Sequence, residues 1–139
     1  MYLYALGRVS FLFAEKRTDM IEFNTKKFIS KLVKEENNEA IELVNELLID
    51  GEELLGEFKH GHDVVAFTSK RIVTIRLSGA HGKKQDYTFI PYTKIDAFAV
   101  DHAGLLEFIV SSAGTLKFGF KAAEDAKEIA NEISKYILA

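Results

Sequence analysis

Hydrophobic and polar positions alternate with a period of two from Glu52 to Phe120, which is typical of β-strands with one buried face. Turn-forming residues interrupt this pattern about every ten residues, and no helical segment separates the strands. The pattern therefore predicts an antiparallel meander. Its seven predicted strands are about 52–59, 63–68, 71–78, 84–91, 95–101, 105–112 and 115–120.

Two segments have helical periodicity instead. Residues 122–137 place Ala126, Ile129, Ala130 and Ile133 on one stripe, and we expect this helix to cover an open end of the bent sheet. Residues 25–48 also read as helical, with a polar stretch in the middle. Either one continuous helix or a hairpin of two helices broken at 37–38 fits this pattern, and two helices are preferred.

The first 14 residues are almost all apolar, but they do not resemble a signal peptide or a transmembrane helix. Arg8 lies inside the apolar run, and Glu15, Lys16 and Arg17 follow it. The run is also too short to cross a bilayer as a helix. We expect an element packed on the core or on a neighbouring chain. A membrane-surface helix is the alternative, although such helices normally carry many basic residues.

Composition and charge exclude several classes of protein. Hydrophobic residues make up 47% and charged residues 28% of the 139 positions, which is ordinary for one globular domain. The net charge of −3 argues against a strongly basic nucleic-acid-binding protein. Cysteine is absent, so disulfides, thiolate metal sites and cysteine nucleophiles are excluded.

Four short segments resemble motifs of the bacterial pleckstrin-homology-like (PH-like) family. Residues 67–72, FTSKRI, are similar to its "FTNKRLI" segment, and residues 90–95, IPYTKI, are similar to "IPYSKI". Residues 48–53, LIDGEE, resemble the passage into the first strand, and Ala103-Gly104 lies where the family has "TAG". The family's acidic stretch after this position is replaced by LLEF at 105–108. The resemblance covers about 38–137, and residues 1–36 lie outside it.

The periodicity and the resemblance together predict an α+β fold with N-terminal helices, a seven-stranded antiparallel PH-like bent sheet or barrel, and a C-terminal capping α-helix. The expected division is a helical extension over 1–48 and the PH-like barrel over 49–139. Members of the family form ring-like homo-oligomers through strand edges, without known enzymatic activity. We therefore expect a cytoplasmic, non-catalytic interaction scaffold that binds itself and an unidentified protein partner. The alternative is a peripheral membrane module that binds anionic headgroups on a membrane surface.

Basic residues near predicted turns are the candidate ligand-binding positions. In eukaryotic PH domains, phosphoinositides bind near the first hairpin, which here contains Lys59, His60 and His62. Since one lysine among carboxylates binds a headgroup poorly, solvated turn charges remain the simpler interpretation. The other candidates, at further turns, are Lys70, Arg71, Lys83 and Lys84.

No cofactor, metal or catalytic site is predicted. His60, His62 and Asp63 are too few for a metal site, which needs about four donors. The pair Asp101-His102 resembles half of a catalytic dyad, but neighbouring strand residues point to opposite faces. The phenylalanines at 67, 108, 118 and 120 have buried-face parity, which argues against base stacking on nucleic acid.

Overall fold

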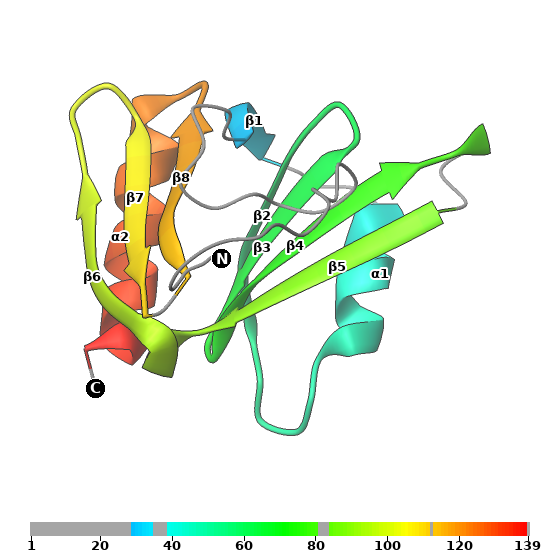
Figure 1. The fold of residues 1–139 in the computed structure, drawn as a ribbon, viewed down its shortest axis with the longest axis horizontal. Helices are drawn as coiled ribbons and strands as arrows, with labels where there is room; N and C mark the ends of the chain where they lie inside the picture. The colour runs from blue at the N-terminus through cyan, green and yellow to red at the C-terminus, as the bar shows by residue number, and fades with distance from the viewer. Residues whose placement is uncertain (1–28, 35–38, 81–83, 112, 139) are drawn as a thin grey trace, which may run out of the picture.

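The computed structural model describes residues 29–34, 39–80, 84–111 and 113–138, and the expected role of residues 1–14 lies outside this part of the chain. A meander of strands is followed by a long C-terminal helix (Figure 1). The elements are β1 (Ile29–Lys34), α1 (Glu39–Leu47), β2 (Leu54–His60), β3 (Asp63–Thr68), β4 (Arg71–Ser78), β5 (Lys84–Pro91), the 3-10 turn η2 (Tyr92–Lys94), β6 (Ile95–Val100), β7 (Leu105–Val110), β8 (Gly114–Phe120) and α2 (Ala123–Ile137).

The strands form one open sheet in the order β5-β4-β3-β2-β1-β8-β7-β6. The seven predicted strands are all present, and their antiparallel pairing is confirmed from β2 to β5 and from β6 to β8. The prediction of seven antiparallel strands is nevertheless wrong, because the sheet has eight strands. The additional strand, β1, is antiparallel to β2 and parallel to β8, so the sheet is mixed.

The prediction of N-terminal helices is wrong for the residues that form β1. Of the region 25–48, the described residues are helical only in α1, and Ile29–Lys34 is a strand. Ile29 lies opposite Phe118 while Leu32 lies opposite Phe120, so β1 contains one extra residue relative to β8. This bulge spaces two buried residues three apart, as on a helix face, and it therefore imitated helical periodicity. The proposed helix break at 37–38 lies outside the described residues.

The main core fills the concave side of the sheet and is rich in aromatic residues. Phe67 lies at its centre, with the rings of Phe58, Phe108, Phe118 and Phe120 within 6.5 Å between centroids. The buried parity predicted for the phenylalanines of β3, β7 and β8 is confirmed. Several rings meet edge to face, the arrangement that aromatic quadrupoles favour.

The predicted C-terminal helix is present as α2 and packs against this core. Its stripe of Ala126, Ile129, Ala130 and Ile133 is buried. The helix contacts β2, β6, β7 and β8, so it joins the two halves of the sheet behind β6 and β7 (Figure 1).

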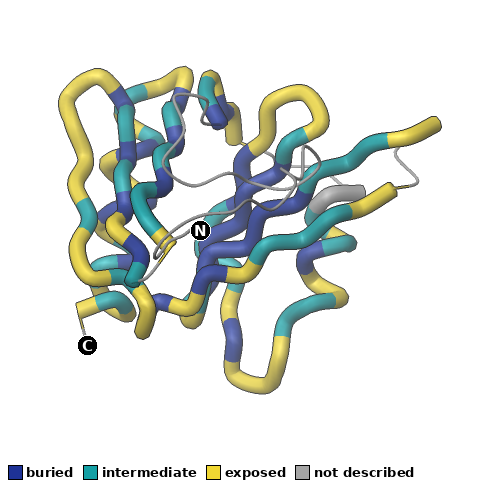
Figure 2. Tube along the Cα trace, viewed as in Figure 1, coloured by how far each residue is buried: buried dark blue, intermediate teal, exposed yellow. Residues whose placement is uncertain are grey.

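A second apolar cluster lies on the opposite face of β3 and β4, under α1. Val44 of α1 packs with Val64, Ala66, Val73 and Ile75. These strands are consequently buried on both faces, and their tube is dark blue over most of its length (Figure 2). This arrangement explains why β3 reads as a continuous apolar run rather than as a strict alternation.

Candidate functional site

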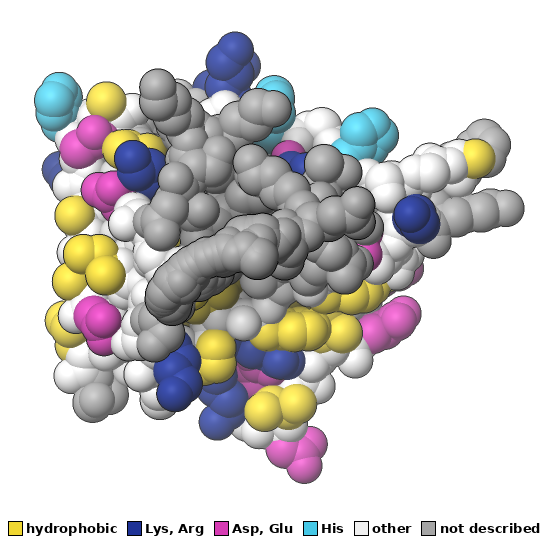
Figure 3. Space-filling view, in the orientation of Figure 1, with side chains coloured by type: hydrophobic (Ala, Val, Ile, Leu, Met, Phe, Trp, Pro, Cys, Tyr) yellow, Lys and Arg dark blue, Asp and Glu magenta, His cyan; other side chains and the backbone are white. Residues whose placement is uncertain are grey.

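A basic groove lies where β1 separates the two halves of the sheet. It has a volume of about 670 Å³ and is lined by Lys31, Val33, Lys59, His60, Gly61, Phe120 and Lys121. The described lining has three lysines and a histidine but neither Asp nor Glu. Lys, Arg and His side chains are visible along this margin of the molecule, above β1 and the β2–β3 hairpin (Figure 3). The described lining of the groove is therefore positively charged, on a chain of net charge −3.

Backbone pairing brings these residues together from three distant parts of the chain. Val33 of β1 lies opposite Lys59 of β2. On the other side, the Lys121 amide donates a hydrogen bond of 2.9 Å to the Leu32 carbonyl. Neighbouring strands are about 4.8 Å apart, so Lys59 and Lys121 are attached about 10 Å from each other. Extended lysine side chains can converge across such a distance.

Lys31 occupies the bulge of β1 and has a left-handed backbone with φ of +54°. A residue with a side chain rarely adopts this conformation outside turns, and it costs free energy. The bulge re-aims a side chain that a regular strand would direct elsewhere. Its consequence is that Lys31 lines the groove together with Val33.

The predicted binding residues fall into separate places. Lys59 and His60 lie in the groove, and exposed His62 follows them across the hairpin turn. Lys84, the first residue of β5, lies at the same end of the strands as the β2–β3 hairpin. Asp63 follows this hairpin and pairs with Arg76, which in turn pairs with Asp86, two residues after Lys84. Lys70 is at the turn between β3 and β4, at the other end of these strands, and Lys83 lies outside the described residues.

The sequence reasoning missed Lys31 and Lys121. Lys31 falls in the segment that the periodicity predicts to be helical, and Lys121 is one of the polar residues that alternate with the apolar residues of the last predicted strand. Nothing in the sequence pattern indicated that β1 would lie between β2 and β8. Only that placement makes the two lysines neighbours of Lys59.

Arg71, the remaining candidate, is engaged in a buried clasp. Its guanidinium donates to both carboxylate oxygens of Glu52, at 2.9 Å from Nε and 3.0 Å from Nη2. Nη2 also donates to the carbonyl oxygen of Leu47, the last residue of α1, at 2.8 Å. The ring of Phe89 lies 4.9 Å from the guanidinium carbon. Arg71 therefore connects α1 to the sheet, and these contacts engage its Nε and Nη2.

The rest of the clasp satisfies the buried carboxylate of Glu52. The Thr68 hydroxyl donates to it at 2.6 Å, and the Ile49 amide donates at 3.1 Å. Burial by itself raises the pKa of Glu52, but the hydrogen bonds from Arg71, Thr68 and Ile49 outweigh it and hold this pKa below its ordinary value. The Tyr92 hydroxyl donates to the Thr68 carbonyl at 2.6 Å, and burial raises the pKa of this phenol.

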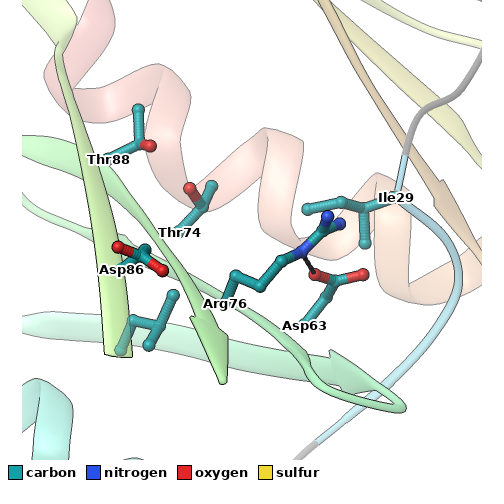
Figure 4. Close-up of a pocket in the computed structure, with 7 residues that line it drawn as sticks. Ile29, Asp63, Thr74, Arg76, Asp86 and Thr88 are labelled. Atoms are coloured by element: carbon teal, nitrogen blue, oxygen red, sulfur yellow. Dashed lines mark hydrogen bonds and ion pairs between the residues drawn. The ribbon is translucent and has the colours of Figure 1, made fainter. Parts of the chain in front are cut away.

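A smaller cavity lies at the end of the concave face, near β1. It has a volume of about 10 Å³, and Thr74, Asp86 and Thr88 lie beside Arg76, which donates to Asp63 at 2.7 Å (Figure 4). A cavity of this size accommodates about one water molecule. It is therefore too small for a substrate.

Asp101, one half of the pair considered for catalysis, has structural partners, and so does Ser111 on the neighbouring strand end. Asp101 accepts hydrogen bonds of 2.9 Å from the amides of Leu105 and Ala103, which lower its pKa. The Ser111 hydroxyl donates to Asp96 at 2.7 Å. Within the described part of the chain, no group of three His, Cys, Asp or Glu residues could hold a metal ion. No described helix has the length and apolarity required to cross a membrane.

Comparison with known proteins assigns this architecture to a family. The bacterial PH domain profile matches residues 23–137, which includes every described strand and α2. The chain belongs to the bacterial PH domain family. PH-like domains are generally non-catalytic, and the match indicates no enzyme family.

Solved bacterial PH domains resemble the chain in structure. A DUF1696 family protein with a pleckstrin-homology domain from Shewanella loihica PV-4 is 25% identical, with a TM-score of 0.65 over 78% of this chain and 98% of that protein. A pleckstrin homology domain from Shewanella amazonensis SB2B is 33% identical, with a TM-score of 0.54 over 72% of this chain and 96% of that domain. The PH-like fold is thus confirmed.

Two Bacillus subtilis strain 168 proteins of uncharacterized function are similar in sequence. YozO is 27% identical over 96 residues, covering 66% of this chain and 83% of YozO. YjqA is 38% identical over 58 residues, covering 42% of this chain and 46% of YjqA. The matched segment thus spans less than half of YjqA.

Proposed function

We propose that this chain is a non-catalytic bacterial PH-like module that assembles with copies of itself through its sheet edges and serves as a protein interaction scaffold. The observation that carries the proposal is the open sheet. Among the described residues, β5 and β6 are its end strands, and each has a neighbour on one side only. Edge strands with unpaired backbone groups are ready templates for another strand.

The hydrogen-bond direction identifies the outward-facing backbone groups. The Asp101 amide donates toward β7, so Val100, one residue earlier in β6, directs its amide to the open side. Likewise, the Tyr92 amide donates toward β4, so Pro91 occupies an outward position in β5, where its missing amide costs no internal bond. The backbone amide of Phe89, two residues before Pro91, faces the same open side of β5.

The two edges suit a head-to-tail contact. Phe89 on β5 is 44% exposed and Val100 on β6 is 38% exposed, so each edge adds apolar surface to its backbone groups. The β4–β5 hairpin also stands out from the body of the molecule (Figures 1 and 3). A β5 edge that pairs with the β6 edge of the next copy makes a heterologous contact, which closes into a ring when the rotation permits.

The decisive experiment combines light scattering with a proline at the edge. We expect the wild-type chain to have a mass several times the monomer mass of 15.7 kDa at micromolar concentration. Val100→Pro removes an outward donor without removing a bond to β7 and should shift the protein toward the monomer. Val100→Thr keeps the donor and should remain assembled. Val100→Lys tests the same edge if the proline variant does not fold.

A monodisperse wild-type monomer at these concentrations contradicts the proposal. An unchanged mass for both Val100→Pro and Val100→Lys excludes this edge as the contact. Circular dichroism and cooperative thermal unfolding show whether each variant retains the fold.

The alternative, a peripheral membrane module, has less support from the predicted residues. Arg71 is committed to Glu52, and Lys70 lies at the opposite end of the strands from Lys59. These groups do not form one basic surface. Salt-sensitive sedimentation with anionic vesicles that is lost on removal of residues 1–14 would favour the alternative.

A further inference from the structure

The gap between β2 and β8 is filled by a strand that is not part of either meander. β1 lies in this gap, antiparallel to β2 and parallel to β8, whereas the other strands pair with their neighbours in sequence. We propose that the gap is a strand-acceptor site, and that the segment 29–34 of a second copy of the chain occupies it in exchange for β1. This contact is separate from the edges β5 and β6, so it does not rest on the proposed function.

Two buried apolar side chains attach β1 to the core. Ile29 is 7% exposed and Leu32 is 0% exposed, and their register partners in β8 are Phe118 and Phe120. The other four residues of β1 are half-buried or exposed. Where a peptide binds by strand addition, backbone hydrogen bonds supply affinity and a few side-chain pockets supply specificity. β1 has the same anatomy, with two anchors in a mostly exposed strand.

The ladder that holds β1 is short and interrupted. The described register joins β1 to β2 at Val33 and Lys34, at one end of the strand. It joins β1 to β8 at Ile29 and Leu32, with the bulge between them. Lys31, in this bulge, has φ of +54°, a conformation that costs free energy in a residue with a side chain. By contrast, β4 and β5 are paired along their whole length. Because local opening needs least free energy where few contacts must break, β1 can leave while the other strands stay paired.

The packing of β1 is also independent of α1, the next element in the chain. Ile29 and Leu32 belong to the main core cluster, whereas α1 packs through Val44 in the second cluster, on the opposite face of β3 and β4. Residues 35–38, all polar, separate the two elements in sequence. Departure of β1 therefore removes no side chain from the cluster under α1. Short connections of this kind favour the exchange of an element between copies.

The fit of β1 to the gap identifies the partner as a second copy. Another copy offers the same six residues, so an exchanged strand repeats the same backbone pairing and buries the same two side chains. Exchange of an identical element is for this reason a low-cost route to a dimer. A different protein would have to reproduce both apolar anchors, their spacing of three and the bulge between them.

Cysteine trapping between two separately prepared full-length variants tests the exchange. Val33 and Lys59 are exposed register partners, and such partners have Cα atoms about 4.5–5.5 Å apart, which suits a disulfide. The wild-type chain has no cysteine. When the Val33→Cys and Lys59→Cys proteins are mixed in a thiol–disulfide buffer, we expect a disulfide-linked heterodimer of twice 15.7 kDa on non-reducing electrophoresis.

A mixture of the Glu107→Cys and Lys117→Cys proteins is the matched control. These residues are also partly exposed register partners, but β7 and β8 form one hairpin, so a link between copies there reflects random collision. We expect the first heterodimer to form at least about fivefold faster than the control, because an exchanged β1 brings its two cysteines to disulfide geometry. Leu32→Asp in the Val33→Cys copy should return the rate to that of the control, since a carboxylate is excluded from this buried position.

Competition with a synthetic peptide of residues 29–34 gives the same information if Leu32→Asp prevents folding. The peptide should slow formation of the heterodimer, and a peptide with Leu32→Asp should not. Val100→Pro in both copies should leave the exchange unchanged, which separates it from edge assembly. Equal rates in the two mixtures, no response to Leu32→Asp or to the peptide, or loss of the link with Val100→Pro overturns the exchange. Linkage of a Val33→Cys peptide to the Lys59→Cys protein without linkage between copies also overturns it, and assigns the gap to a strand from another protein.

Discussion

Replacement of Arg71 by methionine tests whether the clasp stabilises the fold. The Glu52 side chain is 0% exposed and that of Arg71 is 20% exposed, so the substitution leaves a buried carboxylate without its cation. Removal of one partner of a buried ion pair costs about 3–5 kcal/mol. Because Thr68 and Ile49 still donate to Glu52, and methionine keeps the apolar stem, we expect the lower end, about 3 kcal/mol at pH 7.

This loss should depend on pH, with a sign fixed by Glu52. In the wild type the pKa of Glu52 is lowered on folding, so its contribution is fully present above the unfolded value of about 4.5 and is lost as the pH falls through the folded value. In Arg71→Met, burial dominates and raises the pKa of Glu52, so its carboxyl group takes up a proton at a higher pH than in the wild type. Protonation removes the free-energy cost of burying an unpaired carboxylate. The stability difference should therefore shrink toward pH 4.

Urea and thermal unfolding of wild type, Arg71→Met, Glu52→Gln and the double variant measure the effect. Protein concentration must be fixed, because assembly would make the melting temperature depend on it. We expect a decrease of about 10 °C for Arg71→Met at pH 7. The control Lys117→Met removes the exposed contact with Glu107 and should change stability by less than about 0.5 kcal/mol. A difference between Arg71→Met and wild type that stays constant from pH 7 to pH 4 refutes the reasoning.

Three further substitutions test the turn before β7, with the β2–β3 hairpin as its comparison, and the aromatic core. Gly104→Ala should cost more than about 2 kcal/mol in urea unfolding, since its φ is +99° and a Cβ would lie 3.0 Å from the Phe120 carbonyl oxygen and 3.2 Å from the Ala123 Cα. Gly61→Ala, with φ of +61° and open space, should cost only about 1 kcal/mol, and equal losses would contradict the steric argument. Phe67→Ala should destabilise by about 3–5 kcal/mol, and a loss below 1 kcal/mol would show that the core collapses around the site.

The sequence predicted the local elements well because periodicity reports directly on which face is buried. The strands from β2 to β8 and the stripe of α2 follow from alternation and helical spacing. The prediction failed at Ile29–Lys34, where a bulge at Lys31 gave strand residues the spacing of a helix. A one-residue insertion changes the apparent period without any signal in composition, so the error follows from the pattern itself.

The groove could not be predicted because it depends on long-range placement. Lys31 and Lys121 are 90 positions apart in the sequence, and only the insertion of β1 beside β8 makes them neighbours. Lys59 and His60 were identified by their hairpin. A turn pattern locates a residue along a strand, but not the segment that packs next to it.

The segments that carry the family resemblance have a shared structural purpose. Glu52 belongs to the segment 48–53, Thr68 and Arg71 to 67–72, and Tyr92 to 90–95, and all four meet in the clasp. Ala103-Gly104 forms the tight turn before β7. These motifs therefore identify the scaffold, because their chemistry is used to hold α1 and the strands together.

The groove residues Lys31, Lys59 and Lys121 lie outside every one of those segments. The stability of the fold and the positive charge of the groove thus depend on different side chains, and family membership alone does not transfer a ligand to this chain. It follows that Arg71→Met should lower the free energy of unfolding, whereas Lys31→Met and Lys121→Met, at exposed positions, should each change it by less than about 0.5 kcal/mol. A loss of stability in the lysine variants as large as that in Arg71→Met would show that the clasp and the groove are one energetic unit.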